Sequence, residues 1–164
     1  MAYDQINPNG RDKIPRSARS TEPAWVTTVA LPPEAAPFDL QAAINAAGDG
    51  EPTVIELNSD IILNGYDIKI PQDKIIKLTS AGAEITHSID ANRLFRVLSV
   101  SSQAALYLEN IIITGGVGTD SGAGVSVFGG TLVMNNNAAI TGNQASGAGA
   151  GVLIRNGGTF CMNG

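Results

Sequence analysis

Short apolar stretches separated by glycine and asparagine recur through the second half of the chain at a nearly constant distance. The clearest case is the segment 124–135, GVSVFGGTLVMN, which returns as 151–163, GVLIRNGGTFCMN. Val125 recurs 27 residues later as Val152, and Thr131 recurs 28 residues later as Thr159. A single residue is therefore inserted between the matching segments. A period of this size, with short apolar strands and glycine turns, predicts a coil that stacks on copies of itself.

The same register extends upstream through less similar sequence. Ile113-Thr114 precedes Ile140-Thr141 by one such period, and Ile85-Thr86 lies nearly the same distance further upstream. We therefore expect a parallel β-helix with three strands in each coil. The expected strands are 54–57, 61–63 and 68–70 in the first coil, 75–78, 84–86 and 94–97 in the second, 105–108, 111–114 and 125–127 in the third, 131–134, 139–141 and 152–154 in the fourth, and the start of a fifth coil at Thr159.

One segment has the apolar spacing of an α-helix. It runs from Phe38 to Ala47, and Asp39 stands near its start as a candidate cap. The strand at Val54–Leu57 follows almost directly, so we expect this helix to cover the first coil. Because each predicted strand has only about 3 to 5 residues, a continuous core requires the coils to stack.

Two groups of segments carry a resemblance to known proteins. The helix 39–47 (DLQAAINAA), the strand 54–57 and the following Asp60–Leu63 resemble the N-terminal cap and opening coil of the pectate-lyase-like right-handed β-helix superfamily. The later segments GGTLVMN, AITGNQASG and GAGV are similar to repeats of bacterial surface and adhesin-type β-helix proteins. Over residues 38–164, this resemblance implies an all-β, right-handed parallel β-helix of about four to five coils with an N-terminal capping helix. It selects no single function, because enzymes, adhesins and phage tailspikes share the fold.

The chain is expected to have three parts: a proline-rich leader at 1–37, a capping helix and turn at 38–52, and the β-helix at 53–164. The leader holds four basic residues within nine positions, Arg11, Lys13, Arg16 and Arg19. It is either an extended linker or a docking arm that attaches the β-helix to another copy or to a larger particle. Trp25 and the run 26–31 are either the anchor of this arm or an extra strand on the cap.

Composition removes several classes of partner. The net charge is −5 and no basic stripe with interleaved aromatic residues is present, so we expect no nucleic-acid partner. No run approaches the ~18 apolar residues that a membrane-spanning helix needs, so no membrane insertion is expected. The first residues lack the basic and apolar regions of a secretory signal. We nevertheless expect an extracellular, cell-surface or virion location, because the fold resembles proteins that work there.

The catalytic chemistry of the superfamily finds little support in the sequence. Lyases of this fold need acidic residues that hold calcium and a basic residue that abstracts a proton, and hydrolases need two or three close carboxylates. Downstream of Glu84 the acidic residues are only Asp90, Glu109 and Asp120, on different strands or turns. The local group Asp90, His87 and Arg93 is better explained as a solvated turn than as a site. We therefore expect no catalytic residue, metal site or cofactor.

Repeated asparagine and threonine residues are the structural candidates. Asn135, Asn143, Asn156 and Asn163 recur at corners, where hydrogen-bonded ladders would satisfy turn backbone groups; the alternative is a sugar-binding strip. Thr86, Thr114 and Thr141 are expected to form one column, and Thr131 and Thr159 another. The single cysteine, Cys161, lies in an alternating strand and is expected to be a small packed residue.

The last coil carries the candidates for assembly. Thr159, Phe160 and Met162, together with Trp25, are expected to contact a partner, because a coil without a polar cap exposes strand edges and apolar interior. The expected partner is another copy stacked end to end or the rest of a longer surface protein. The sequence thus favours a non-enzymatic structural or adhesive module, against a carbohydrate-active enzyme, a tailspike domain or a carbohydrate-binding module.

Overall fold

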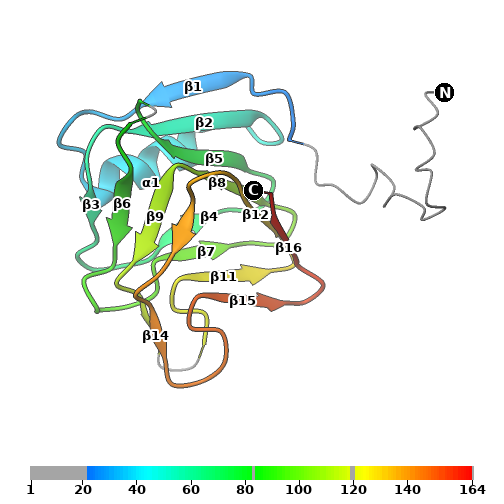
Figure 1. Cartoon of the computed structure of the whole chain (residues 1–164). Helices are drawn as coiled ribbons and strands as arrows, with labels where there is room; N and C mark the ends of the chain where they lie inside the picture. The colour runs from blue at the N-terminus through cyan, green and yellow to red at the C-terminus, as the bar shows by residue number, and fades with distance from the viewer. Residues whose placement is uncertain (1–21, 83, 119–120, 164) are drawn as a thin grey trace, which may run out of the picture.

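The chain folds into a parallel β-solenoid of about five turns with one short helix near the N-terminus (Figure 1). The computed structural model describes residues 22–163 apart from 83, 119 and 120. The four basic residues of the predicted leader and Asp120 therefore lie outside the described residues. The expected fold class, with its N-terminal capping helix, is confirmed.

Every ladder in the solenoid is parallel, and each of the first four coils adds one strand to each of three sheets. In spatial order, the first sheet contains β1 (Thr27–Ala30), β2 (Pro52–Leu57), β5 (Ile75–Ser80), β8 (Ala105–Glu109), β12 (Thr131–Met134) and β16 (Thr159–Met162). The second contains β3 (Ile61–Ile62), β6 (His87–Asp90), β9 (Ile111–Thr114) and β13 (Ala139–Ile140). The third contains β4 (Ile68–Ile70), β7 (Leu98–Val100), β11 (Val125–Phe128) and β15 (Val152–Arg155), and a small pair joins β10 (Val117–Gly118) to β14 (Gln144–Ala145).

The core is a set of columns, because equivalent residues of successive coils stand directly above one another. On the first sheet Ile55 pairs with Leu78, Leu78 with Leu108, and Leu108 with Met134. All four belong to one buried apolar cluster, which also includes Ile89 of the second sheet. Since strand side chains alternate between faces, the residues between these inward positions point away from the core.

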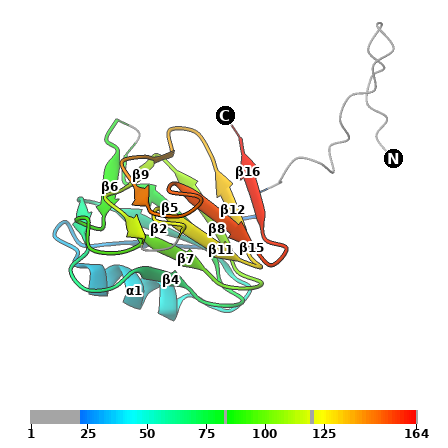
Figure 2. The same cartoon turned by 90° about the horizontal axis from the view of Figure 1, so that it is seen from below.

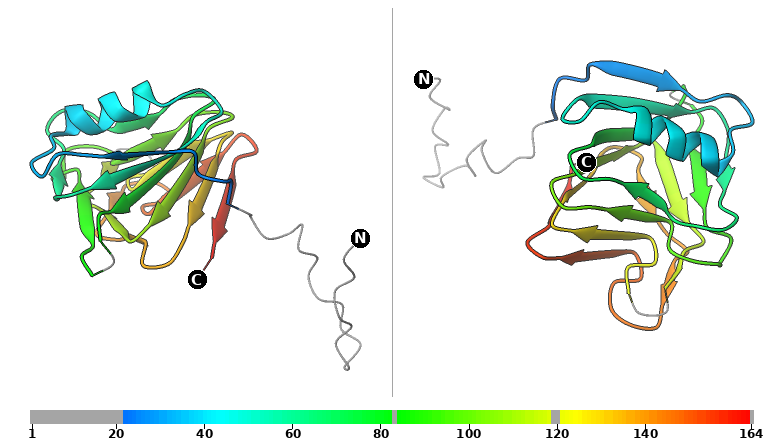
Figure 3. Two further views of the ribbon diagram at one scale, coloured as in Figure 1. Left: turned by 90° about the horizontal axis from the view of Figure 1, so that it is seen from above. Right: turned by 180° about the vertical axis from the view of Figure 1, so that it is seen from behind.

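The helix α1 (Pro37–Ala46) closes one end of the stack, and β16 lies at the other end (Figures 2 and 3). Leu40 and Ile44 of α1 are fully buried. The Gln41 side chain exchanges two hydrogen bonds with the backbone of Lys69 in β4, at 2.8 and 2.9 Å. Asp39 Oδ2 accepts a hydrogen bond from the Ala36 backbone N–H at 2.8 Å, which satisfies a free donor at the helix start. The predicted cover over the first coil is thus present, one residue earlier than expected.

Two strands of the second coil lie downstream of their predicted positions. Instead of 84–86 and 94–97, the structure has β6 and β7, at His87–Asp90 and Leu98–Val100. The apolar residues that suggested the earlier positions, Ile85 and Leu94, are exposed in loops. The prediction was wrong there because apolar residues in exposed loops cannot be distinguished from strand residues by their hydrophobicity alone.

The inserted residue of the repeat falls in a turn. Phe128 pairs with Arg155 and Thr131 pairs with Thr159, so the turn after β11 has two residues and the turn after β15 has three. The strands keep their register because the extra residue is accommodated between them.

Candidate functional site

A short segment before β1 crosses the outer face of the first sheet. We call residues 22–26 the strap. Glu22 contacts Asn135, directly after β12, and Trp25 contacts Tyr107 of β8. The Val26 backbone N–H donates to the Pro52 carbonyl at 2.9 Å, at the start of β2. The strap therefore runs across the coils from the fourth back to the first, and β1 then pairs with β2.

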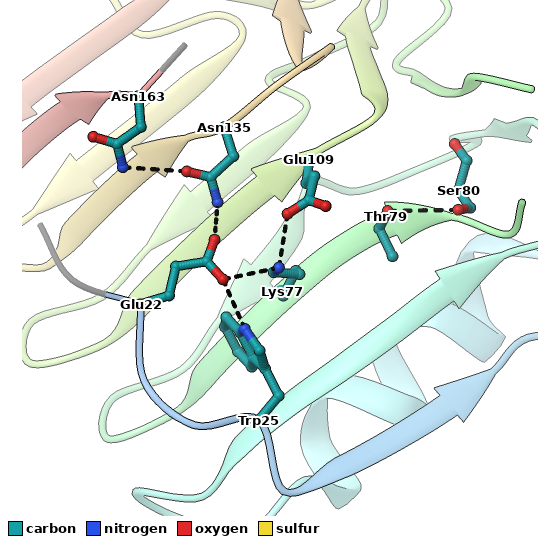
Figure 4. A network of polar contacts seen from close by, with 8 residues as sticks. All are labelled: Glu22, Trp25, Lys77, Thr79, Ser80, Glu109, Asn135 and Asn163. Carbon is teal, nitrogen blue, oxygen red and sulfur yellow. Dashed lines mark hydrogen bonds and ion pairs between the residues drawn. The ribbon is translucent and has the colours of Figure 1, made fainter. Parts of the chain in front are cut away.

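Lys77 is the charged centre under the strap (Figure 4). Its Nζ atom lies 2.7 Å from Glu109 Oε2 and 3.0 Å from Glu22 Oε2. Glu22 also accepts hydrogen bonds from the Trp25 indole, at 2.9 Å, and from the Asn135 amide. The Glu22 carboxylate thus joins a strap aromatic residue to side chains of the second and fourth coils.

Two aromatic residues complete the contact. The rings of Trp25 and Tyr107 meet edge to face, with centroids 5.1 Å apart and an interplanar angle of 87°. The Lys77 ammonium lies 4.9 Å from the centroid of the Trp25 ring, within the range of a cation–π contact. These contacts add to the ion pairs, so the strap is held by charge and by aromatic packing.

The surface under the strap is buried although it points away from the core. Lys77 pairs with Tyr107 and Tyr107 with Val133 in one outward column. Their exposed fractions are 8%, 7% and 0%. The contacts made by Glu22 and Trp25 place the strap over this column, which explains why a lysine is buried on the outside of a sheet.

The ionisation of the cluster is consistent with a fixed ion pair. Burial raises the pKa of the Glu22 carboxyl, but hydrogen bonds from Trp25, Lys77 and Asn135 and the Lys77 charge together lower the pKa below its ordinary value. Burial lowers the pKa of Lys77, but hydrogen bonds and charges from Glu109 and Glu22 raise it above its ordinary value. Both groups are therefore charged at neutral pH.

A polar groove adjoins the cluster along the carboxyl ends of the strands. Its volume is about 480 Å³, and it crosses β1, β2, β5 and the turns after β8 and β12. The lining residues are Thr28, Val54, Glu56, Lys77, Thr79, Ser80, Gly82, Glu109, Asn110, Asn136 and Asn137. Hydroxyl, amide and carboxylate groups dominate, so the groove offers hydrogen bonds rather than an apolar surface.

The one local group of charged residues noted in the sequence does not converge. Asp90 Oδ1 accepts a hydrogen bond from the Asn92 backbone N–H at 2.7 Å. His87 Nδ1 lies 3.6 Å from Asp60 Oδ1. His87 and Asp90 are three positions apart on β6, so their side chains point to opposite faces of the strand.

The asparagine candidates occupy different kinds of position. Asn163 Nδ2 donates to Asn135 Oδ1 at 3.2 Å, so these two residues stack one coil apart. Asn143 accepts from the Gly116 N–H at 2.8 Å and donates to the Ile113 and Thr141 carbonyls, which ties two coils at a corner. Asn156 sits in a turn with φ of 53°, a left-handed conformation that asparagine tolerates well.

The threonine column contains two of its three expected members. Ile140 pairs with Ile113, so Thr141 follows in register with Thr114. The expected alignment of Thr86 is wrong, because β6 pairs Asp90 with Thr114. Thr86 instead donates to Asn110 Oδ1 at 2.8 Å. The error comes from the same displacement of β6 that shifted the strand prediction.

The assembly candidates lie in two places. Trp25 is in the strap, against the solenoid's own side. Phe160 and Met162 continue the inward columns of the first sheet on β16, and they are 38% and 72% exposed. Thr159 of β16 is also exposed and pairs with Thr131, as the repeat predicts. The free Cys161 is half-buried on the opposite face of the same strand.

Two kinds of feature are absent from the described residues. In that part of the chain, no three or more His, Cys, Asp or Glu side chains are grouped so as to hold a metal ion. Within the same residues, no helix has the length and apolar character that crossing a membrane requires.

Sequence reasoning missed most of the strap cluster. The repeat spacing aligns Ile75 with Ala105, and the same register places Thr79 opposite Glu109, two positions from Lys77. The Lys77–Glu109 pair could therefore have been inferred from the repeat. The contribution of Glu22 had none, since the strap precedes the first coil and follows no repeat.

Comparison with models of known protein families, with curated proteins and with solved structures found no match to this chain. The parallel β-solenoid therefore stands on the structure, and the superfamily resemblance remains a prediction.

Proposed function

We propose that this chain is a non-enzymatic structural and adhesive module, a β-solenoid rod of a cell-surface protein or of an extracellular fibre. The observation that supports this role is the use of charged side chains as ties between successive coils. Lys77 and Glu109 join the second coil to the third. An extracellular, cell-surface or virion location belongs to the same proposal.

The ties recur on the other sheets. Asp60 Oδ1 accepts hydrogen bonds from the Ser88 N–H and hydroxyl, at 2.7 and 3.1 Å, between the first and second coils. Asp67 Oδ2 accepts from the Ser99 hydroxyl at 2.7 Å between the same coils. Further along, Arg96 donates to two loop carbonyls of the third coil, and Arg155 of the fourth coil donates to Ser121 Oγ at 3.0 Å. A stack tied in this way resists separation of its coils.

The same ties argue against acid–base chemistry at the strap cluster. A glycosidase needs one carboxyl group with a raised pKa beside a second carboxylate. Glu22 has the reverse, a pKa lowered by its partners, and Glu109 is held by Lys77. Glu22 therefore acts as a fixed charge and not as a proton donor.

A second candidate function, carbohydrate binding, is favoured by the polar groove. Glu56 and Glu109 contribute negative charge, while Lys77 is already paired with two carboxylates. A neutral or amino-bearing saccharide suits this lining, and an acidic polysaccharide is repelled. The exposed amide of Asn136 supplies a donor and an acceptor for sugar hydroxyls.

One experiment addresses both candidates. The purified chain is incubated with neutral glucans and with polygalacturonate, and reducing ends, unsaturated products and retention in affinity gels are measured. We expect no cleavage of any polymer; cleavage above a buffer control would overturn the non-enzymatic role. If the groove binds carbohydrate, neutral glucans in the gel slow the migration of the chain. Asn136→Ala should reduce this effect. Asn64 is exposed but lies outside the groove, so Asn64→Ala should leave the effect unchanged.

A further inference from the structure

The strap is recognised by side chains of the solenoid. The strands β5, β8 and β12 pair on both sides, so their backbone N–H and C=O groups are already used within the sheet. The contacts that hold Glu22 and Trp25 come from the side chains of Lys77, Tyr107 and Asn135. A surface of this kind binds a segment through contacts between side chains and does not require the segment to pair as a strand.

The recognition has two parts, three residues apart in the strap. The first is an anion contact, in which the Lys77 ammonium and the Asn135 amide hold the Glu22 carboxylate. The second is an aromatic contact, in which the Trp25 indole and the Tyr107 ring meet edge to face beside the Lys77 charge. Together they define a site for an acidic residue and an indole in a Glu-x-x-Trp spacing.

The strap belongs to an arm at the edge of the fold. The arm, residues 22–30, consists of the strap and β1, which pairs on one side only, with β2. Three of the four β1 residues are exposed, and so is Val26. A short connection with consecutive prolines, Pro32 and Pro33, separates the arm from α1. An edge strand joined to the body by one short connection is an element that copies of a protein exchange at low cost.

We propose that the face formed by Lys77, Tyr107 and Asn135 is a docking site for a Glu-x-x-Trp segment, and that the arm of a second copy of this chain fills it. Copies that exchange arms are clasped side to side, with each strap bound on its neighbour's first sheet. This interaction is independent of the structural role proposed above, since a monomeric rod keeps its own arm in place.

The test uses the full chain with its own strap weakened. Trp25 is the single tryptophan, so a Trp25→Ala acceptor has no tryptophan fluorescence. A peptide with the sequence of residues 22–27, EPAWVT, then carries the only indole in the mixture, and its fluorescence anisotropy reports binding. We expect saturable binding at micromolar to millimolar peptide. A Trp25→Phe acceptor serves if the alanine variant fails to fold.

Controls assign the binding to the two contacts. Lys77→Met in the acceptor weakens binding roughly tenfold or more, as loss of a charged hydrogen-bond partner requires. Lys69→Met, an exposed lysine of the third sheet, leaves binding unchanged. On the Trp25→Ala acceptor, a peptide with Gln in place of Glu22 binds more weakly than the EPAWVT peptide. On the acceptor that also carries Lys77→Met, this change in the peptide causes no further loss of affinity. No saturable binding, or equal binding by the Lys77→Met and Lys69→Met acceptors, would overturn the proposal.

Discussion

Individual glycines set how closely neighbouring coils approach. A Cβ atom on Gly124 would lie 2.4 Å from the Gly151 carbonyl oxygen of the next coil and 2.7 Å from Ile140 Cγ2. Because the carbonyl is backbone, relief of this clash would shift a coil. We expect Gly124→Ala to lower the free energy of unfolding by about 1–3 kcal/mol, the usual cost of overpacking, in urea titrations followed by circular dichroism.

The matched control is Gly65→Ala. Nothing lies within 4 Å of a Cβ atom at Gly65, and its backbone is not in the left-handed region. This substitution should stabilise by about 0.4–1 kcal/mol or change nothing, because it restricts the unfolded chain without straining the native one. Equal losses from both substitutions would contradict the view that coil spacing depends on Gly124.

At the scale of elements, the sequence predicted strands that belong to the repeat and missed contacts that lie outside it. β9 and β12 match their predicted bounds, because their apolar residues recur in register with those of neighbouring coils. The positions of β6 and β7 were wrong, since exposed Ile85 and Leu94 imitate strand residues. The strap cluster was missed for a related reason: it forms between Glu22, outside any repeat, and coils far along the chain.

The strap itself should respond to pH. The pKa of Glu22 is lowered in the folded chain, so its contribution to docking is complete above the ordinary carboxylate pKa and is lost as pH falls through the lowered value. The charged groups that face it are Lys77 and Glu109. The pKa of Lys77 is raised, so its contribution is complete below the ordinary lysine pKa and persists to about pH 10.

Tryptophan fluorescence checks this prediction, because Trp25 is the single tryptophan and donates to Glu22. We expect a transition in emission below about pH 4, with circular dichroism of the solenoid unchanged over the same range. Glu22→Gln should remove the transition, and Glu109→Gln, which leaves the Glu22 contacts to Trp25 and Asn135, should retain it. A transition of equal size in the Glu22→Gln variant would assign the titration to another group.

At the scale of the whole molecule, the two ends of the stack differ. α1 covers the apolar interior of the first coil with Leu40 and Ile44, and the free edge at this end belongs to β1, whose exposed residues are Thr27, Thr28 and Ala30. At β16 the inward residues Phe160 and Met162 are exposed beside a strand that pairs on one side only. Exposed apolar side chains next to a free strand edge favour association.

We expect two copies to associate through β16 as a two-fold dimer, because apolar core positions are exposed at this end and are covered by α1 at the other. Sedimentation velocity over a concentration series, with the arm contact weakened by Trp25→Ala, should show dimers, and adding Met162→Glu should shift the equilibrium to monomers by placing charge in the interface. The control is Phe38→Glu, which places charge on the exposed face of α1 at the opposite end. If both substitutions dissociate the assembly, copies stack head to tail and the product is an open filament, so this pair of variants separates a closed dimer from a growing fibre.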